Sequence, residues 1–168
     1  GNVYSLFADS KYQPPYRSPV NVALLKDIVV GDFVLECNLQ STVKDYDHRS
    51  LVLVFGYQDP AHFYYVHFGK KTDNHANQIF IVNGAPRLKI STETTPGTKW
   101  DDDWHRVKIA HDTSDGTIEG FFDTMKRPVM EAIDETFRWG QIGLGAFDDL
   151  GNFDNIVLRG QVVKKPSR

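Results

Sequence analysis

The sequence predicts an all-β protein, an antiparallel sandwich of two sheets. About a dozen short runs alternate apolar and polar residues, turn residues separate them at hairpin spacing, and no segment has convincing long helical periodicity. The 168 residues fit one domain of ordinary size with a real hydrophobic core.

The first half of the chain begins with a proline-rich segment and continues with strands. Residues 1–20 contain three prolines, so we expect an extended N-terminal segment with a short strand at 4–7. Another short strand follows at 21–26. The clearest strand is 32–43, where apolar residues alternate with more polar ones. This strand holds the only cysteine, Cys37, which we interpret as a small buried residue. Residues 50–58 are apolar on both faces, which is typical of a central strand.

Three further strands are expected between residues 59 and 90. Residues 63–68 and 78–82 alternate in the same way, and Asn83-Gly84 is typical of a two-residue hairpin turn of type I′ leading to a strand at 87–90. One face of this group is aliphatic. The other face carries polar and aromatic side chains: Tyr65, His67, Gln78, Arg87 and Lys89.

The second half continues the strand pattern to the end of the domain. We expect strands at 104–112, 117–123, 140–147 and 152–159. Residues 126–137 also have some helical spacing, but we favour strand and turn there. The domain is therefore predicted to span 21–160, between the extended segment 1–20 and a C-terminal tail at 161–168.

Composition excludes several classes of function. The formal charge of −3 provides no basic surface for nucleic acid. No run of about 18 apolar residues is present, so we expect no membrane insertion. A single cysteine rules out an intramolecular disulfide and a zinc-cysteine cluster.

The polar and aromatic sheet face is the place where we expect a ligand. Planar Arg and Gln groups hydrogen-bond sugar hydroxyls, and aromatic rings pack on the C–H faces of sugars. Arg49 and His75 are expected at the margins of this face. The alternative is that these are ordinary solvated side chains, and the pattern alone leaves that alternative open.

The order of the segments resembles a known group of folds. The runs GDFVLECNLQS, LVLVFGYQDPAHFYYVHFG, WHRVKIAHD and DETFRWGQIGLGAFDDLGNFDNIVL, within residues 21–159, are similar to the concanavalin A-like jelly rolls of the laminin G type. The resemblance is strongest to bacterial domains attached to polysaccharide-degrading enzymes, including the 3-keto-disaccharide hydrolase-like branch. It implies two packed sheets with carbohydrate on the concave side.

The same resemblance implies further properties. It suggests a secreted or periplasmic location and other domains of a larger secreted enzyme as neighbours. It also implies a structural Ca²⁺ site that uses Gly31 and Asp154, and no organic cofactor. Asp148 and Asp149, by contrast, read as a solvated turn.

Catalysis finds less support in the sequence. Retaining glycosidases need two carboxylates about 5 Å apart, and no spacing in this chain supplies such a pair. The candidates for an acid or base are His67, Glu36 and Glu119, each without an identified partner. The leading hypothesis is therefore carbohydrate binding. The alternatives are a glycoside hydrolase or polysaccharide lyase of the same fold and a laminin G-like adhesion module, which would need a large exposed apolar patch.

Overall fold

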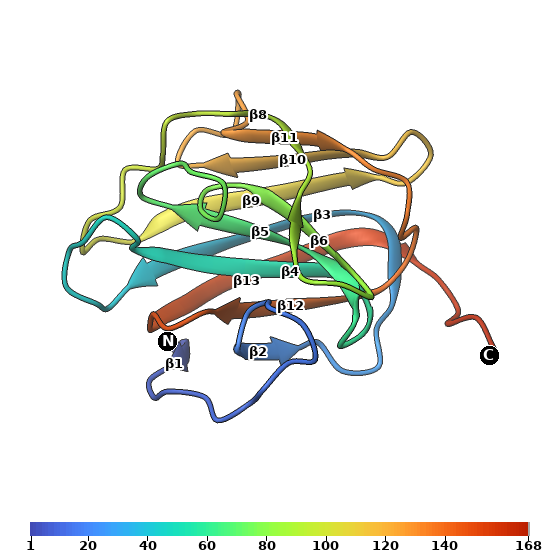
Figure 1. Cartoon of the computed structure of the whole chain (residues 1–168), viewed down its shortest axis with the longest axis horizontal. Helices are drawn as coiled ribbons and strands as arrows, with labels where there is room; N and C mark the ends of the chain where they lie inside the picture. The colour runs from blue at the N-terminus through green and yellow to red at the C-terminus, as the bar shows by residue number, and fades with distance from the viewer. Residues whose placement is uncertain (168) are drawn as a thin grey trace.

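The computed structural model describes residues 1–167 as a sandwich of two antiparallel sheets without a helix (Figure 1). The seven-stranded sheet has the order β1 (Tyr4–Leu6), β13 (Gly151–Val162), β3 (Val30–Ser41), β9 (His105–Asp112), β10 (Thr117–Phe122), β11 (Met130–Ile133) and β8 (Ser91–Thr94). The six-stranded sheet has the order β2 (Asn21–Leu24), β12 (Gln141–Ala146), β4 (Ser50–Asp59), β5 (His62–Gly69), β6 (Ile79–Asn83) and β7 (Leu88–Lys89). The prediction of a two-sheet antiparallel jelly-roll sandwich is confirmed.

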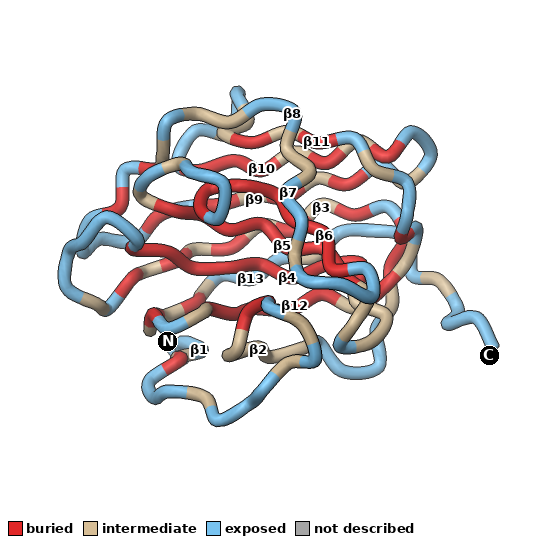
Figure 2. Tube along the Cα trace, in the orientation of Figure 1, coloured by how far each residue is buried: buried red, intermediate tan, exposed pale blue. Residues whose placement is uncertain are grey.

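The main core lies between the two sheets, where the alternating residues of each strand meet. In β3, Phe33, Leu35, Cys37 and Leu39 are buried, and the residues between them are half-buried (Figure 2). Burial also raises the pKa of the Cys37 thiol to about 12, which keeps it protonated and unreactive. The interpretation of Cys37 as a small core residue is therefore confirmed.

The centre of the six-stranded sheet is buried on its outer face as well. A second apolar cluster lies there, and the N-terminal segment between β1 and β2 covers it through Tyr16. The backbone N–H of Arg87 donates to the carbonyl of Arg17 at 3.2 Å, which ties this segment to the sheet edge. The buried members of this outer cluster are Val52, Val54, Phe63, Tyr65, Phe80 and Val82.

Two local predictions were wrong and one was confirmed. The register pairs Ile81 with Leu88, so β6 and β7 are joined by a longer loop than a two-residue turn, and only Gly84 adopts a positive φ, of 66°. No strand was expected between residues 90 and 104, but β8 lies there and pairs with β11 in the other sheet. Residues 126–137 do form strand and turn rather than helix, as expected.

Candidate functional site

A hollow of about 200 Å³ opens on the outer face of the six-stranded sheet. β5 and the start of β4 form part of it, and five segments outside the strands complete it: the N-terminal segment, the loop before β4, the loops on either side of β6 and the loop after β12. Its lining residues are Arg17, Tyr46, His48, Ser50, His67, His75, Arg87, Phe147, Asp148 and Asp149. The polar groups therefore come from segments far apart in the sequence.

Phe147 is the aromatic centre of the hollow. Its ring is half-buried, and it packs against Tyr65 and His67 at centroid distances of 5.9 and 6.0 Å. The guanidinium carbons of Arg17 and Arg87 lie 5.2 and 4.9 Å from the same ring centroid. Two planar cations thus flank one partly accessible aromatic ring, an arrangement stabilised by cation–π attraction.

His67 lies on β5 and is buried beside this ring. Its Nδ1 accepts a hydrogen bond from the backbone N–H of Asn77 at 3.0 Å, so the ring proton is on Nε2. Burial, assisted by the positive charge of Arg87, lowers the pKa of His67 to about 4. At neutral pH His67 is therefore an uncharged hydrogen-bond donor, which suits ligand binding better than acid catalysis.

Two carboxylates lie on the loop after β12. Asp149 is buried, accepts a hydrogen bond from the Tyr46 hydroxyl, and accepts another from the backbone N–H of Ser50 at 2.8 Å. Burial raises the pKa of this carboxyl group. Asp148 is exposed and lines the hollow. The interpretation of both residues as a solvated turn was wrong for Asp149, because its oxygens satisfy groups inside the protein.

The predicted ligand residues on the sheet divide into those that line the hollow and those that do not. His67, His75 and Arg87 line it. Gln78 and Lys89 do not line it. The Gln78 side-chain amide already donates to the carbonyl of Asp73 at 2.9 Å, and the Lys89 ammonium group donates to Asn74 Oδ1 at 2.9 Å.

Tyr65 was expected to stack on a ligand, and the structure contradicts this. The residue is fully buried, with its ring stacked on Phe80 at 4.9 Å. The ring of Phe147, which packs against Tyr65, is half-buried and is therefore the one that a ligand could reach.

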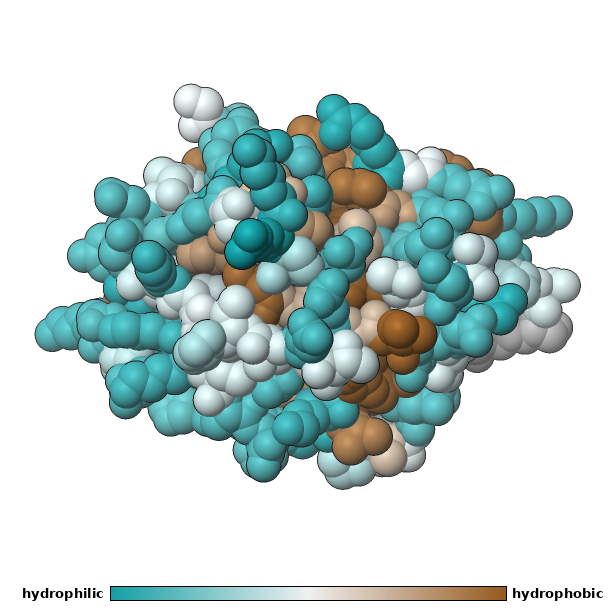
Figure 3. All heavy atoms as spheres, turned by 90° about the horizontal axis from the view of Figure 1, so that it is seen from above, coloured by the Kyte–Doolittle hydropathy of each residue, from teal (hydrophilic) through white to brown (hydrophobic). Residues whose placement is uncertain are grey.

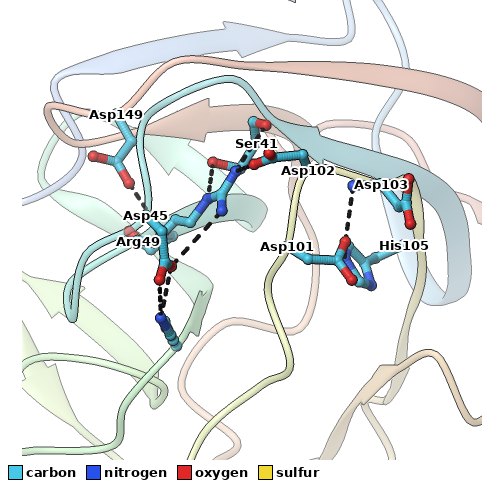
Figure 4. A network of polar contacts seen from close by, with 10 residues as sticks. Ser41, Asp45, Arg49, Asp101, Asp102, Asp103, His105 and Asp149 are labelled. Carbon is cyan, nitrogen blue, oxygen red and sulfur yellow. Dashed lines mark hydrogen bonds and ion pairs between the residues drawn. The ribbon is translucent and has the colours of Figure 1, made fainter.

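The expected position of Arg49 at the margin of the ligand face was also wrong. Its side chain is 1% exposed, does not line the hollow, and donates to Ser41 Oγ at 2.8 Å and to Asp102 Oδ1 at 2.6 Å (Figure 4). Residue 49 shares its face of the sheet with core residues Leu51 and Leu53, since successive strand residues alternate. Arg49 therefore has a structural role.

Glu36 and Glu119 lie on the opposite side of the molecule from His67. Both belong to the seven-stranded sheet, where Glu36 pairs with Arg106 at 3.2 Å and Glu119 lies opposite Glu131 in the register. The main core separates them from the outer face of the six-stranded sheet. Neither glutamate can therefore act together with His67 as an acid and base pair.

The residues suggested for calcium do not fit one ion. Asp154 pairs with Asn38, whereas Gly31 lies seven residues further along β3. Seven residues of strand span on the order of 20 Å, far beyond the 2.3–2.6 Å of a calcium–oxygen bond. Within residues 1–167 no three His, Cys, Asp or Glu side chains form a group able to hold a metal ion.

Trp100 and Trp104 do not line the hollow. Trp100 is buried and donates its indole N–H to the carbonyl of Phe68 at 3.0 Å. Trp104, directly before β9, is 40% exposed.

Two of the other hollows are less suited to a polar ligand. The larger, of about 440 Å³, lies on the seven-stranded sheet, and its Asp32 carboxylate already accepts two hydrogen bonds from Thr113. The other, of about 260 Å³, lies beside the N-terminal segment and is lined mainly by apolar groups such as Tyr57 and Phe63. The hollow around Phe147 is the one in which two guanidinium groups and a partly accessible ring meet.

Sequence reasoning missed most of this hollow. Apart from Ser50 on β4, its additional members come from loops, where neither alternation nor spacing indicates which way a side chain points. The only available signal was a basic or aromatic residue near proline or aspartate, which is too common to be informative. The missed residues are Arg17, Tyr46, His48, Ser50, Phe147, Asp148 and Asp149.

The architecture is that of a two-sheet antiparallel jelly-roll sandwich. No family model and no curated protein matches the sequence. Among solved structures, the chain is similar to a carbohydrate-binding module, CBM66, from Bacillus subtilis, with a TM-score of 0.66, 18% identity, and coverage of 86% of this chain and 84% of that one.

Two other solved structures extend this comparison. A candidate glycosyl hydrolase from Parabacteroides distasonis has a TM-score of 0.58 and 15% identity, with coverage of 95% of this chain and 100% of that one. Peanut lectin has a TM-score of 0.54 and 12% identity, with coverage of 98% and 99%. These likenesses establish the fold.

Proposed function

We propose that the protein binds carbohydrate in the hollow around Phe147. The observation that carries this proposal is the convergence of guanidinium, imidazole, phenol and carboxylate groups around one partly accessible ring. A sugar presents hydroxyls that both donate and accept hydrogen bonds, together with apolar C–H faces, and this site offers a partner for each.

The size of the hollow limits the ligand. Pockets for drug-sized molecules measure about 300–1,000 Å³, and this one measures about 200 Å³. It is therefore suited to one sugar ring or to the end of a chain, with the rest of a polysaccharide in solvent. The similar carbohydrate-binding module and lectin support binding as the function of the fold here.

Binding is favoured over catalysis by the state of the polar groups. His67 is neutral at physiological pH, and Asp149 is occupied by two internal hydrogen bonds. Neither is free to exchange protons with a ligand. We place the protein in a secreted or periplasmic setting, where binding to polysaccharide would bring attached domains to their substrate. Residues 1–167 include no helix that could cross a membrane.

A panel of soluble polysaccharides tests the proposal when each sample is read by thermal shift and by release of reducing ends. We expect a shift without release for at least one polysaccharide, and loss of the shift in Phe147→Ala and Asp148→Asn. Asp154→Asn, on the seven-stranded sheet, is the matched control and should keep it. Release of reducing ends that disappears in Asp148→Asn would instead establish a hydrolase, and the absence of any shift would refute the proposal.

A further inference from the structure

Arg17 and Arg87 form no ion pair with any residue that the structure describes. Three other arginines form ion pairs of 2.6–3.2 Å, Arg49 with Asp102, Arg106 with Glu36 and Arg138 with Glu135. The two arginines of the hollow are thus charged groups without a partner charge, at the site where a ligand is proposed to bind.

The structure also holds these two arginines together. Both guanidinium groups lie about 5 Å from the Phe147 ring, and Arg87 also lies 5.6 Å from the Phe80 ring. The backbone hydrogen bond from Arg87 to Arg17 fixes the two segments beside each other. Preorganised guanidinium groups bind a planar anion with little further loss of side-chain entropy.

Arg87 is partly removed from water without compensation. Its Nε is buried and has no hydrogen-bond partner within residues 1–167. The Tyr65 hydroxyl lies close enough for the Arg87 charge to affect its pKa, yet no hydrogen bond of standard geometry joins the two groups. A buried donor on a charged group costs free energy when it is unpaired, and a bound anion would offset that cost.

The remaining groups of the hollow have the opposite character. Asp148 is exposed and offers its carboxylate to the hollow, and the buried Asp149 adds a second carboxylate, whose oxygens accept from Tyr46 and Ser50. Carboxylates accept hydrogen bonds from sugar hydroxyls but repel a second negative charge. The site therefore suits a ligand with a single anionic group at one end and hydroxyls at the other.

From these observations, and resting on the proposed carbohydrate function, we infer that the ligand is an acidic sugar whose carboxylate is held by Arg17 and Arg87. A uronic acid residue has this chemistry. Its carboxylate matches the planar guanidinium groups, its hydroxyls face Asp148, and its ring packs against Phe147.

Titration calorimetry with trigalacturonate, triglucuronate and their methyl esters tests the inference, because the ester removes the charge and retains the sugar. We expect at least one acid to bind tenfold or more tightly than its ester, and this preference to weaken in high salt. It should fall below threefold in Arg17→Met and in Arg87→Met. Arg17 is exposed, so its variant is not expected to disturb folding.

Arg159→Met is the control, because Arg159 lines the hollow on the opposite sheet, and it should keep the full preference. Equal binding of acid and ester would overturn the inference and leave the proposed function standing. Tighter binding of a sulfated oligosaccharide than of either uronate would overturn the choice of carboxylate. No binding of any acidic, esterified or neutral sugar would refute the proposed function itself.

Discussion

Tyr64 and Tyr65 are neighbours on β5 that point to opposite faces of the sheet. Replacement by phenylalanine is predicted to destabilise the protein at position 64 but not at position 65. Both side chains are fully buried. The Tyr64 hydroxyl donates to Asp134 Oδ1 at 2.5 Å and accepts from the backbone N–H of Phe137 at 3.0 Å. The Tyr65 hydroxyl has no hydrogen-bond partner in residues 1–167.

Tyr64→Phe should lower the free energy of unfolding by about 2–3 kcal/mol. A hydrogen bond to a charged group contributes about 1.5–3 kcal/mol, and the mutation also leaves the Phe137 N–H unsatisfied. Tyr65→Phe removes a hydroxyl whose desolvation is not compensated, so it should change stability by about zero or increase it by about 1 kcal/mol.

Urea denaturation followed by intrinsic fluorescence measures both variants against the wild type, with equal m-values as the check that the denatured states are comparable. The difference between the two variants should therefore be at least about 2 kcal/mol. Equal destabilisation by the two mutations would refute the reasoning, because it would show that the Tyr65 hydroxyl is paired as well as the Tyr64 hydroxyl.

Three more predictions concern single residues. The pKa of His67 in the folded state is about 4, below its ordinary value of 6.5, so wild-type stability should fall by roughly 3 kcal/mol as pH drops from 6.5 to 4. His67→Gln should lose this part of the pH dependence in urea titrations, and an unchanged profile would contradict it. Arg49→Met should lower the free energy of unfolding by about 2 kcal/mol, since it removes the hydrogen bonds that the buried guanidinium donates to Ser41 and Asp102, and should leave sugar affinity unchanged; a loss of affinity would count against its structural role. Gly140→Ala should cost about 2–3 kcal/mol or prevent folding, because the added methyl carbon would lie 2.1 Å from the Gly56 carbonyl carbon, and a wild-type melting temperature would contradict this.

The fold could be predicted from the sequence because strand alternation is a local property. Phe33, Leu35 and Cys37 identify the buried face of β3 without knowledge of the partner strands. The same pattern placed His67 and Arg87 on one outer face, where the structure has them. The alternation of apolar and polar residues does not show where a strand ends. For that reason the two-residue turn predicted at Asn83-Gly84 was shorter than the loop that joins β6 to β7.

The site was only partly predictable because accessibility is not local. Tyr65 lies on the predicted outer face of the sheet, but Tyr16 and Phe147, each far away in the sequence, pack over the same cluster. Tyr65 is therefore buried. Arg49 follows a polar loop, and only the position of Asp102 on another loop shows that its charge is satisfied inside the protein. These contacts depend on tertiary folding, which one-dimensional patterns do not contain.

The adhesion hypothesis would require a large exposed apolar surface. Seen from the β8 and β11 edge, hydrophobic residues form a band interrupted by hydrophilic ones (Figure 3). The exposed hydrophobic side chains include Leu88 on β7 and Ile133 on β11, which are 64% and 67% exposed and belong to different sheets. This distribution is typical of an ordinary protein surface and does not favour a docking face.

The pairing of the two ends of the chain has a consequence for how the protein is made. β1 pairs with β13, with Tyr4 opposite Phe153, and β2 pairs with β12. β1 and β2 are synthesised before the strands they pair with, so nearly the whole domain has to close as a loop before either edge is complete. Until then the outer apolar cluster lacks Phe147. Folding of the domain should therefore be slow, and the yield of soluble protein should depend on how long the incompletely folded domain avoids aggregation.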